Sequence, residues 1–256
     1  MTTVTEPFVS IAGITAHVAT IRLNRPPNNF FSFDMISALA DALEKLDTKD
    51  DCRCVVLAAD GKNFCAGADF SGNASPYSTA DLYNAATRLF RTNKPFVAAV
   101  NGAAIGGGLG LALSADFRVA SPESKFSANF AQLGFHHGFG LSVTLPRLVG
   151  EQKAAELLFT GRRLNGTEAH AIGLVDQLVA TAEIESAACA LASEIASSAP
   201  LAVESIRATL RNGIANQVAQ ATQREMAEQT RLKATADFVE GTTAVAQRRP
   251  AEFQRK

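Results

Sequence analysis

The first quarter of the chain alternates between strand-like and helix-like spacing of hydrophobic positions. Residues 14–24 have the two-residue period of a strand, and the segment "PPNN" that follows ends it. Residues 34–50 carry apolar side chains at helical spacing. Residues 52–60 form an apolar run that predicts a buried strand. The pattern therefore predicts a mixed α/β fold.

The order strand, strand and helix recurs in the next hundred residues. Ser78 or Thr79 is the expected N-cap of the next helix. The predicted elements are a helix over 78–93, a strand and turn over 94–106, a helix over 108–115, strands over 116–121 and 125–130, and a helix over 140–150.

From about residue 151 the chain is mainly helical. Thr167 is the expected N-cap of a short helix, and long Ala-rich helices run to about Arg248. No low-complexity linker separates this part from the rest. The helical C-terminal part is therefore predicted to pack on the core or on a neighbouring subunit.

Composition and charge exclude several classes of protein. The 256 residues are 47% hydrophobic and 19% charged, which is typical of a folded enzyme. A net charge of -1 draws the chain neither to nucleic acid nor to a membrane surface. No apolar run reaches spanning length, and the N-terminus lacks the pattern of a signal peptide, so a cytoplasmic protein is expected. The four cysteines have no zinc or disulfide spacing, and no metal is expected.

Two glycine-rich stretches are candidates for chemistry: "GKNFCAGADF" at 61–70 and "NGAAIGGGLGLALSAD" at 101–116. Glycine-rich turns that lead into a helix expose backbone N–H groups, which hold a phosphate or a developing oxyanion. The second stretch has neither the Lys-Ser/Thr of a P-loop nor a clean dinucleotide-binding fingerprint. The alternative is a tight turn with close helix packing.

Five motifs in register resemble the enoyl-CoA hydratase/isomerase (crotonase) family. They are "FCAGAD", "NGAAIGGGLGLALSADFRVAS", "LGFHHGFGLSVTLPRLVG", "FTGRRLNGTEAHAIGLVDQLV" and "EGTTAVAQRRPAEF", and together they span essentially the whole chain. The resemblance implies an α/β crotonase fold, with a ββα spiral core over residues 1–195 that holds an acyl-CoA site. It also implies a C-terminal helical region over 196–256 that assembles trimers, often paired into hexamers. The implied ligand is an acyl-CoA thioester, with coenzyme A as part of the substrate and no separate cofactor.

By motif position, the resemblance implies an oxyanion hole formed by the backbone N–H groups of Ala68 and Gly107. Gly107 begins a predicted helix, where the fixed peptide dipoles favour negative charge. One such donor is worth about 3–4 kcal/mol in the transition state. Cys65 is then a small apolar residue beside the site, because nothing basic lies near it in sequence.

The resemblance also implies that coenzyme A lies along the first glycine-rich stretch. The backbone from Ala66 to Asp69 would meet the adenine, and the turn "NRPPNN" would border the pantetheine. Arg25 and Lys62 are candidates for phosphate contact, with a solvated surface charge as the alternative for each. Asp69 is alternatively a residue that fixes the turn or starts the next helix.

The resemblance fails at the acidic positions. The two glutamates of the family's hydratases correspond to Gly110 and Phe130, and the acid of its isomerases corresponds to Gly138. A general acid or base contributes roughly 10² to 10⁴ in rate, so these losses can remove most hydration activity. Phe130 and Phe135 instead indicate an apolar acyl site, unless they belong to the core.

Other groups must supply the proton chemistry if the protein is an enzyme. A histidine at 136 or 137 titrating near neutral pH could act as general base, and His137 is favoured because it adjoins Gly138. The alternative is that one ring fills a place usually held by an apolar residue. Tyr77 and Tyr83 are lesser candidates.

Two functions remain open from the sequence. The first is an acyl-CoA enzyme, a lyase or isomerase of the enoyl-CoA hydratase/isomerase type, that works through the oxyanion hole. The second is a catalytically silent paralogue that binds acyl-CoA.

Overall fold

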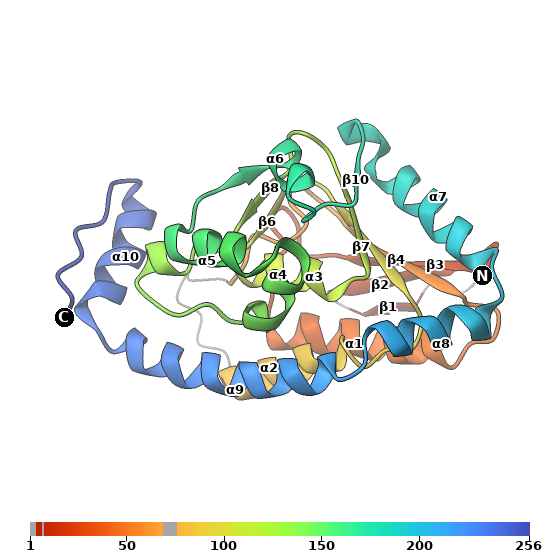
Figure 1. Ribbon diagram of the computed structural model, residues 1–256, viewed down its shortest axis with the longest axis horizontal. Helices are drawn as coiled ribbons and strands as arrows, with labels where there is room; N and C mark the ends of the chain where they lie inside the picture. Colours follow the sequence, from red (N-terminus) through yellow and green to blue (C-terminus); the bar gives the residue numbers. More distant parts are fainter. Residues whose placement is uncertain (1–3, 7, 69–75) are drawn as a thin grey trace.

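A computed structural model describes residues 4–6, 8–68 and 76–256 of the chain (Figure 1). Seven strands form one sheet in the order β1-β2-β3-β4-β5-β7-β10, and three form a second sheet in the order β6-β8-β9. The strands are β1 (Val4–Glu6), β2 (Val9–Thr15), β3 (Val18–Leu23), β4 (Cys54–Ala59), β5 (Phe96–Val100), β6 (Ala103–Ile105), β7 (Phe117–Ala120), β8 (Lys125–Ser127), β9 (Leu164–Asn165) and β10 (Gln177–Leu178).

Helices surround these sheets, and four of them follow one another from residue 184 to residue 247 (Figure 1). They are α1 (Phe33–Asp47), α2 (Thr79–Arg88), α3 (Gly107–Ser114), α4 (Leu141–Val149), α5 (Glu151–Thr160), α6 (Gly166–Ala171), α7 (Ile184–Ala196), α8 (Pro200–Leu210), α9 (Ile214–Lys233) and α10 (Ala236–Gln247). Two 3₁₀ turns complete the set, η1 (Ala131–Leu133) and η2 (Thr181–Glu183).

The predicted repeat of strand, strand and helix is confirmed in β5-β6-α3 and again in β7-β8-α4. The first strand of each unit joins the large sheet, where β3, β4, β5 and β7 pair in parallel. The second strand turns away into the small sheet, where β6 and β8 pair in parallel. Each unit therefore advances both sheets by one strand before its helix returns the chain.

The apolar run over 54–59 is continuous because β4 is covered on both faces. Cys54, Val56 and Ala58 pack beneath α7 in one buried cluster. Val55 and Leu57 face the opposite way, into the larger cluster that contains α1. A central parallel strand with two covered faces has no solvent side to carry polar residues.

The strand predicted over 14–24 is confirmed as β3 over residues 18–23, but its first two residues belong to β2, which pairs with β3 as an antiparallel hairpin. The hairpin turns at Ala16 and His17, which adopt positive φ values of 49° and 67°. Two-residue hairpin turns of this kind usually carry glycine or asparagine. Neither residue is present here, so the turn had no sequence signal.

The predicted N-cap at Thr167 is wrong. Helix α6 begins at Gly166, and its N-cap is Asn165, whose Oδ1 accepts the N–H of Glu168 at 2.8 Å. The carboxylate of Glu168 accepts the N–H of Asn165 in return, also at 2.8 Å. At the other predicted cap, Ser78 does cap α2 and forms the same reciprocal pair with Asp81.

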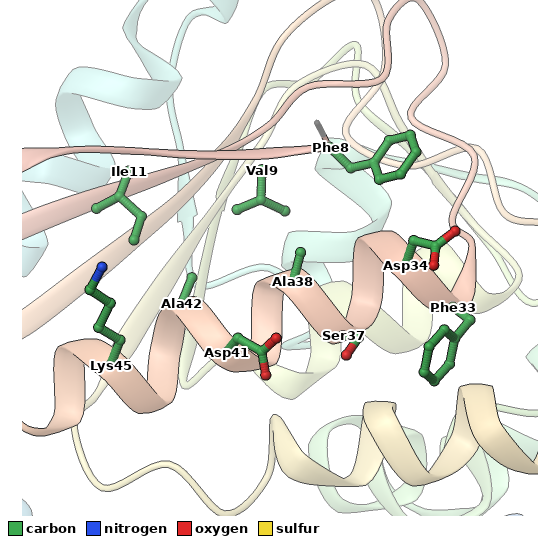
Figure 2. Close-up of a pocket in the computed structure, with 10 residues that line it drawn as sticks. All are labelled: Phe8, Val9, Ile11, Phe33, Asp34, Ser37, Ala38, Asp41, Ala42 and Lys45. Carbon is green, nitrogen blue, oxygen red and sulfur yellow. The ribbon is translucent and has the colours of Figure 1, made fainter. Parts of the chain in front are cut away.

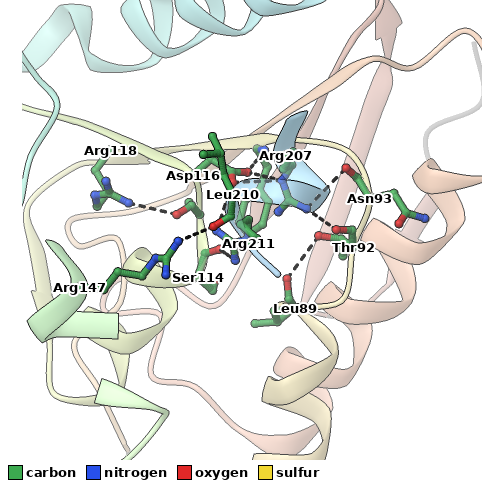
Figure 3. A network of polar contacts seen from close by, with 12 residues as sticks. Leu89, Thr92, Asn93, Ser114, Asp116, Arg118, Arg147, Arg207, Leu210 and Arg211 are labelled. Atoms are coloured by element: carbon green, nitrogen blue, oxygen red, sulfur yellow. Dashed lines mark hydrogen bonds and ion pairs between the residues drawn. The ribbon is translucent and has the colours of Figure 1, made fainter. Parts of the chain in front are cut away.

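The C-terminal helices extend along the core rather than standing apart from it (Figure 1). Helix α9 packs against α2 and α4, and α10 packs against η1. Helix α8 is tied to the core by Asp116, whose carboxylate binds Arg207 Nε at 2.9 Å and Arg211 Nη1 at 3.1 Å (Figure 3). The same carboxylate accepts the N–H of Phe96 at the start of β5, at 3.0 Å.

Within the described ranges, no single helix is long and apolar enough to cross a bilayer. The segments Thr181–Ala196 and Pro200–Leu210, which meet at a bend of 105°, pass that test of length and composition only as a pair. The described residues also contain no group of three His, Cys, Asp or Glu side chains arranged as metal ligands.

Candidate active site

One parallel bridge brings the two glycine-rich stretches together. Cys65 pairs with Ala104, with the N–H of Cys65 bonded to Ala103 O and the N–H of Ile105 bonded to Cys65 O, both at 3.0 Å. Ala68 and Gly107, the two residues expected to donate to an oxyanion, each lie three positions beyond this bridge. Parallel chains leave a bridge in the same direction, so both backbones reach the same end of the structure.

Among the described residues, neither N–H group has a backbone acceptor. Ala68 and Phe31 form an isolated parallel β-bridge. In this bridge the N–H of Phe31 donates to the backbone oxygen of Gly67, the residue before Ala68, at 3.0 Å. Because amide groups alternate along an extended chain, the N–H of Ala68 points away from Phe31. Gly107 is the first residue of α3, and first-turn N–H groups have no acceptor within their own helix.

Close packing explains why glycine is needed where α3 begins. A Cβ at Gly108 would lie 2.1 Å from Cys65 O, and one at Gly107 would lie 2.2 Å from the ring of Phe31. The start of α3 thus presses directly on the first glycine-rich stretch. The tight-turn alternative and the oxyanion-hole expectation are therefore compatible, because the close approach is what aims the helix N-terminus at Ala68 and its neighbours.

Ala68 and Gly107 line the same cavity, which has a volume of about 530 Å³. The cavity is mostly apolar. It is lined by the loop before α1, by the glycine-rich stretch after β4, by α2, by the start of α3, by η1 and its flanking residues, and by the last two helices. Its lining residues are Phe30, Phe31, Ala66, Gly67, Ala68, Thr79, Leu82, Tyr83, Ile105, Gly106, Gly107, Asn129, Phe130, Leu133, Phe135, Gly138, Phe139, Gln229, Lys233, Thr242, Val245 and Ala246.

Aromatic side chains fill the space that side chains at the acidic positions would need. A Cβ at Gly110 would lie 2.6 Å from Cβ of Phe139. A Cβ at Gly138 would lie 1.9 Å from the hydroxyl oxygen of Tyr83. Phe130 itself lines the cavity and makes an edge-to-face contact with Phe135, with 5.4 Å between ring centroids. The expectation of an apolar acyl site thus matches the position of both phenylalanines, which also belong to the main buried cluster.

Tyr83 and Gln229 form a polar pair on the cavity wall. The Tyr83 hydroxyl donates to Gln229 Oε1 at 3.1 Å, and Gln229 Nε2 donates to the backbone oxygen of His136 at 3.0 Å. Burial raises the pKa of Tyr83, and the negative charge of Glu225 raises it further. The phenol is therefore neutral at ordinary pH.

The two loop histidines are not among the cavity-lining residues. Their rings stack on one another with centroids 4.1 Å apart, and His136 Nδ1 lies 2.8 Å from His137 O. His137 Nε2 lies 2.8 Å from Ser142 Oγ, and the His137 ring stands edge-to-face to the cavity-lining Phe130, with 6.5 Å between ring centroids. Burial, with the adjacent His136, lowers the pKa of His137 from 6.5 to about 4. This disagrees with the expected titration near neutral pH, while its role as a base stays a prediction.

Behind His137 lies Glu225, a carboxylate with no solvent exposure. It accepts the N–H groups of Gly140 at 2.9 Å and Ser142 at 3.0 Å, and the hydroxyl of Ser142 at 2.7 Å. These donors belong to the start of α4, where a negative charge is stabilised by the helix dipole. His137 Nε2 is 3.9 Å from this carboxylate, but a neutral imidazole forms no ion pair with it.

Of the residues expected to contact coenzyme A, some line the cavity and others do not. Ala66 lines the cavity, and its N–H donates to Asn28 O at 2.9 Å. Arg25 is half-buried, with Nη1 bonded to Phe30 O at 2.6 Å, and Lys62 is exposed. Neither cation is a cavity-lining residue. Asp69 lies outside the residues that the structure describes.

A second cavity of about 380 Å³ lies between β2 and α1 (Figure 2). It is lined by apolar side chains such as Phe8, Val9 and Ile11, with Asp34, Asp41 and Lys45 at its polar side. None of the site residues expected from the sequence lines it. The chemistry therefore has to be sought in the larger cavity.

Three residues important to this site were missed from the sequence: Phe139, Gln229 and Glu225. Phe139 lies between Gly138 and Gly140. This position beside the expected site residue Gly138 was the local sequence signal that could have pointed to it. Gln229 and Glu225 lie one turn apart on α9, almost a hundred residues beyond the loop they contact. Glu225 occupies a position of α9 that follows the helical spacing of the buried residues Val218 and Thr222. A glutamate at such a buried position was the sequence signal that could have identified it.

Comparisons with known proteins agree with the geometry. Residues 13–256 match the family described as Enoyl-CoA hydratase/isomerase. A putative enoyl-CoA hydratase/isomerase of Bacillus subtilis, YngF, is 33% identical over 246 residues, covering 93% of this chain and 95% of that protein. Crotonyl-CoA hydratase of Syntrophomonas wolfei is 34% identical over 244 residues, covering 92% and 94%. The crystal structure of an enoyl-CoA hydratase/isomerase from Pseudoalteromonas atlantica superposes with a TM-score of 0.87 at 29% identity, covering 96% of this chain and all of the other.

Proposed function

The chain belongs to the enoyl-CoA hydratase/isomerase family, and on this premise we propose that it binds acyl-CoA thioesters and stabilises their enolates. The thioester oxygen would accept hydrogen bonds from the N–H groups of Ala68 and Gly107. As an enolate develops, negative charge grows on that oxygen, and fixed donors in a water-poor cavity stabilise the charge without reorganising. The observation that carries the proposal is the convergence of these two residues on one cavity.

The acyl group would occupy the aromatic part of the cavity. Phe130, Phe135 and Phe139 present ring edges and faces to it, and burial of acyl carbons against them supplies binding energy. The coenzyme A part of the ligand would extend out of the cavity along Ala66. Arg25 and Lys62 are the candidate contacts for its phosphate groups. The reaction would be hydration, isomerisation or a related lyase step.

A second function is a silent paralogue that binds acyl-CoA without turnover. It is favoured by one observation: within the described residues, the cavity lining contains no aspartate, glutamate or histidine. Tyr83 is the ionisable hydroxyl there, and its raised pKa makes it a poor base.

Crotonyl-CoA separates the two functions. Its binding would be measured by calorimetry and its hydration by loss of the enoyl-thioester absorbance, in the same protein sample. Exchange of the α-protons of butyryl-CoA in deuterium oxide would be followed by mass spectrometry. Binding with hydration or exchange supports the enzyme, and loss of turnover in His137→Ala but not in His136→Ala would support the predicted base. Binding without either reaction supports the silent paralogue, and absence of binding overturns both.

We also propose that the C-terminal helices assemble a homotrimer, either alone or as a pair of trimers. Helix α8 exposes Leu201, Ile206 and Leu210, which leaves a large apolar face in contact with water in a single chain. Light scattering after size-exclusion chromatography would measure the mass, and Ile206→Asp should shift the assembly to monomers. A monomeric wild-type protein at micromolar concentration would contradict the proposal.

A further inference from the structure

A cavity of about 410 Å³ lies where helix α8 meets the loop between α2 and β5. The loop contributes Arg91 to its lining, and α8 with the residue that follows it contributes Glu204, Arg207 and Arg211. Among the described lining residues, Glu204 is the one acidic side chain beside these three arginines. None of these residues lines the cavity proposed for the acyl group. The cavity at α8 is therefore a separate place with an excess of positive charge.

Arg207 carries a buried positive charge that is incompletely bonded. It is 8% exposed, and its Nε donates to the two carboxylate oxygens of Asp116 at 3.0 and 2.9 Å (Figure 3). Its Nη1 donates to the backbone oxygens of Thr92 and Asn93. These bonds fix the orientation of the planar guanidinium. The remaining nitrogen, Nη2, is buried and has no acceptor among the described residues, which is costly for a charged donor.

Arg211 shares the counter-ion of Arg207. Its Nη1 lies 3.1 Å from Asp116 Oδ1, its guanidinium carbon lies 5.9 Å from the centroid of the Phe90 ring, and its buried Nε has no acceptor in the described part of the chain. Burial lowers the pKa of Arg211, although the charge of Asp116 raises it. The positive charges of Arg207 and Arg147 lower it further. One carboxylate thus serves two guanidinium groups, and positive charge at this junction exceeds negative charge.

Arg91 completes the set from the other wall of the cavity. It follows α2 and is exposed, so its guanidinium is free to turn toward a ligand. On α8, Glu204 and Ser205 line the cavity, whereas Ile206 and Leu210 of the apolar face proposed for assembly do not. Helical spacing turns these two pairs to different sides of α8. The cavity is therefore distinct from the centre of that apolar face.

We propose that this cavity binds a phosphate group, with Arg91 as its direct partner and with Arg207 and Arg211 as the buried source of positive charge. A phosphate group carries a charge of about −1.5 to −2 at pH 7, and its oxygens match the guanidinium fork in charge-assisted hydrogen bonds. The source is inorganic phosphate or a phosphomonoester, which present the same oxygens. Glu204, half-buried at the cavity, opposes binding by its charge. The inference does not rest on the proposed acyl-CoA activity.

Calorimetric titration with inorganic phosphate, at constant ionic strength, tests this inference. We expect wild-type protein to bind saturably with a dissociation constant of about 1 mM or below. Arg91→Gln should weaken binding about tenfold, because it removes charge-assisted hydrogen bonds. Glu204→Gln should tighten binding about two- to fivefold, because it removes a repelling charge. Arg224→Gln is the matched control, since Arg224 is 77% exposed on α9 and does not line the cavity, and it should change the constant by less than about twofold.

Glycerol 3-phosphate, titrated in the same way, distinguishes the two sources. Binding as tight as that of inorganic phosphate supports a phosphomonoester as the ligand, and binding of inorganic phosphate alone supports the free ion. If neither ligand binds folded wild-type protein saturably, the inference is overturned. Equal weakening by Arg91→Gln and Arg224→Gln also overturns it, because it would reveal a general effect of net charge. Circular dichroism checks that each variant is folded.

Discussion

Gly110 packs against Phe139, whose side chain lines the larger cavity. Any side chain at 110 would place its first carbon 2.6 Å from Cβ of Phe139. Phe139 also has a positive φ of 62°, which is unusual for a phenylalanine and natural for a glycine. The Phe139 side chain in this position therefore leaves no room for an acidic side chain at residue 110.

A double-mutant cycle on this pair tests that arrangement. Gly110→Ala would ordinarily stabilise a helix by about 1 kcal/mol. Here we expect it to lower the free energy of unfolding by about 1–3 kcal/mol, because the added carbon overpacks against Phe139. In a Phe139→Gly background the same change should cost less, or stabilise. Urea unfolding of the four proteins gives the coupling, and simple additivity would show that the two residues do not compete for space.

His137 makes a separate prediction for pH dependence. Its pKa is about 4 in the folded protein and near 6.5 when unfolded, so between these values the unfolded chain binds more protons. Stability contributed by the neutral ring is complete above pH 6.5 and is lost as the pH falls toward 4. The loss amounts to up to about 3 kcal/mol.

The comparison is between wild-type protein and His137→Gln, whose amide cannot titrate and can still donate to Ser142. In urea unfolding between pH 7.5 and pH 4, the stability of wild-type protein should fall relative to that of His137→Gln. At pH 7.5, where both side chains are neutral, the two proteins should differ by a fixed amount that serves as the reference. Parallel curves over the whole range would contradict a buried neutral histidine.

At the scale of elements, the loop with the two histidines is held by helix α9. Glu225 binds the first N–H groups of α4 and Gln229, one turn later, binds His136 O. One helix from the C-terminal part therefore fixes both the start of α4 and the position of the Tyr83 hydroxyl. The loop gains its geometry from contacts that lie far away in sequence.

Glu225→Gln tests the cap on α4. An amide keeps one oxygen but turns a donor toward N–H groups, so we expect a loss of about 1–3 kcal/mol in unfolding free energy. Glu228→Gln is a matched control on the same helix, because its partners Arg224 and Arg231 are largely exposed. That change should cost under about 1 kcal/mol. If urea unfolding showed equal losses of stability for Glu225→Gln and Glu228→Gln, the buried Glu225 carboxylate would have no special role in stability.

At the scale of the whole molecule, Asp116 connects the sheet, the end of α3 and helix α8 (Figure 3). Two arginines of α8 and its end share this one carboxylate, and each carries a buried nitrogen that has no other partner in the described structure, Arg207 Nη2 and Arg211 Nε. The charge of Asp116 is thus the counter-ion that the two arginines share where α8 meets the core.

Asp116→Asn should lower the free energy of unfolding by about 3–5 kcal/mol, because it leaves two buried guanidinium groups without a counter-ion. Asp60→Asn removes the same charge from a half-exposed pair with Arg22, 3.4 Å apart, and should cost under about 1 kcal/mol. Thermal unfolding at equal protein concentration compares the two. A small effect of Asp116→Asn would mean that α8 is held by its apolar packing instead.

The sequence by itself determined the fold and singled out the two residues that we propose as oxyanion donors. Apolar periodicity predicted most helices and strands, since each element has to turn one face or both to the core. The resemblance of the glycine-rich motifs to the family assigned Ala68 and Gly107 to one site, and both residues line one cavity in the structure. The family followed from the order of these motifs, and the comparisons confirmed it.

Only the tertiary structure decided which side chains line the cavity proposed to hold the acyl group. The sequence does not show which side chains lie beside Gly110 and Gly138. In the structure, Phe139 and Tyr83 occupy the space that side chains at these two positions would need. Gln229 reaches the cavity from α9, more than ninety positions beyond the loop it contacts. Local sequence patterns report the burial of each residue along its own element. Contacts between distant elements depend on how those elements cross, and the crossing is fixed only when the chain is packed.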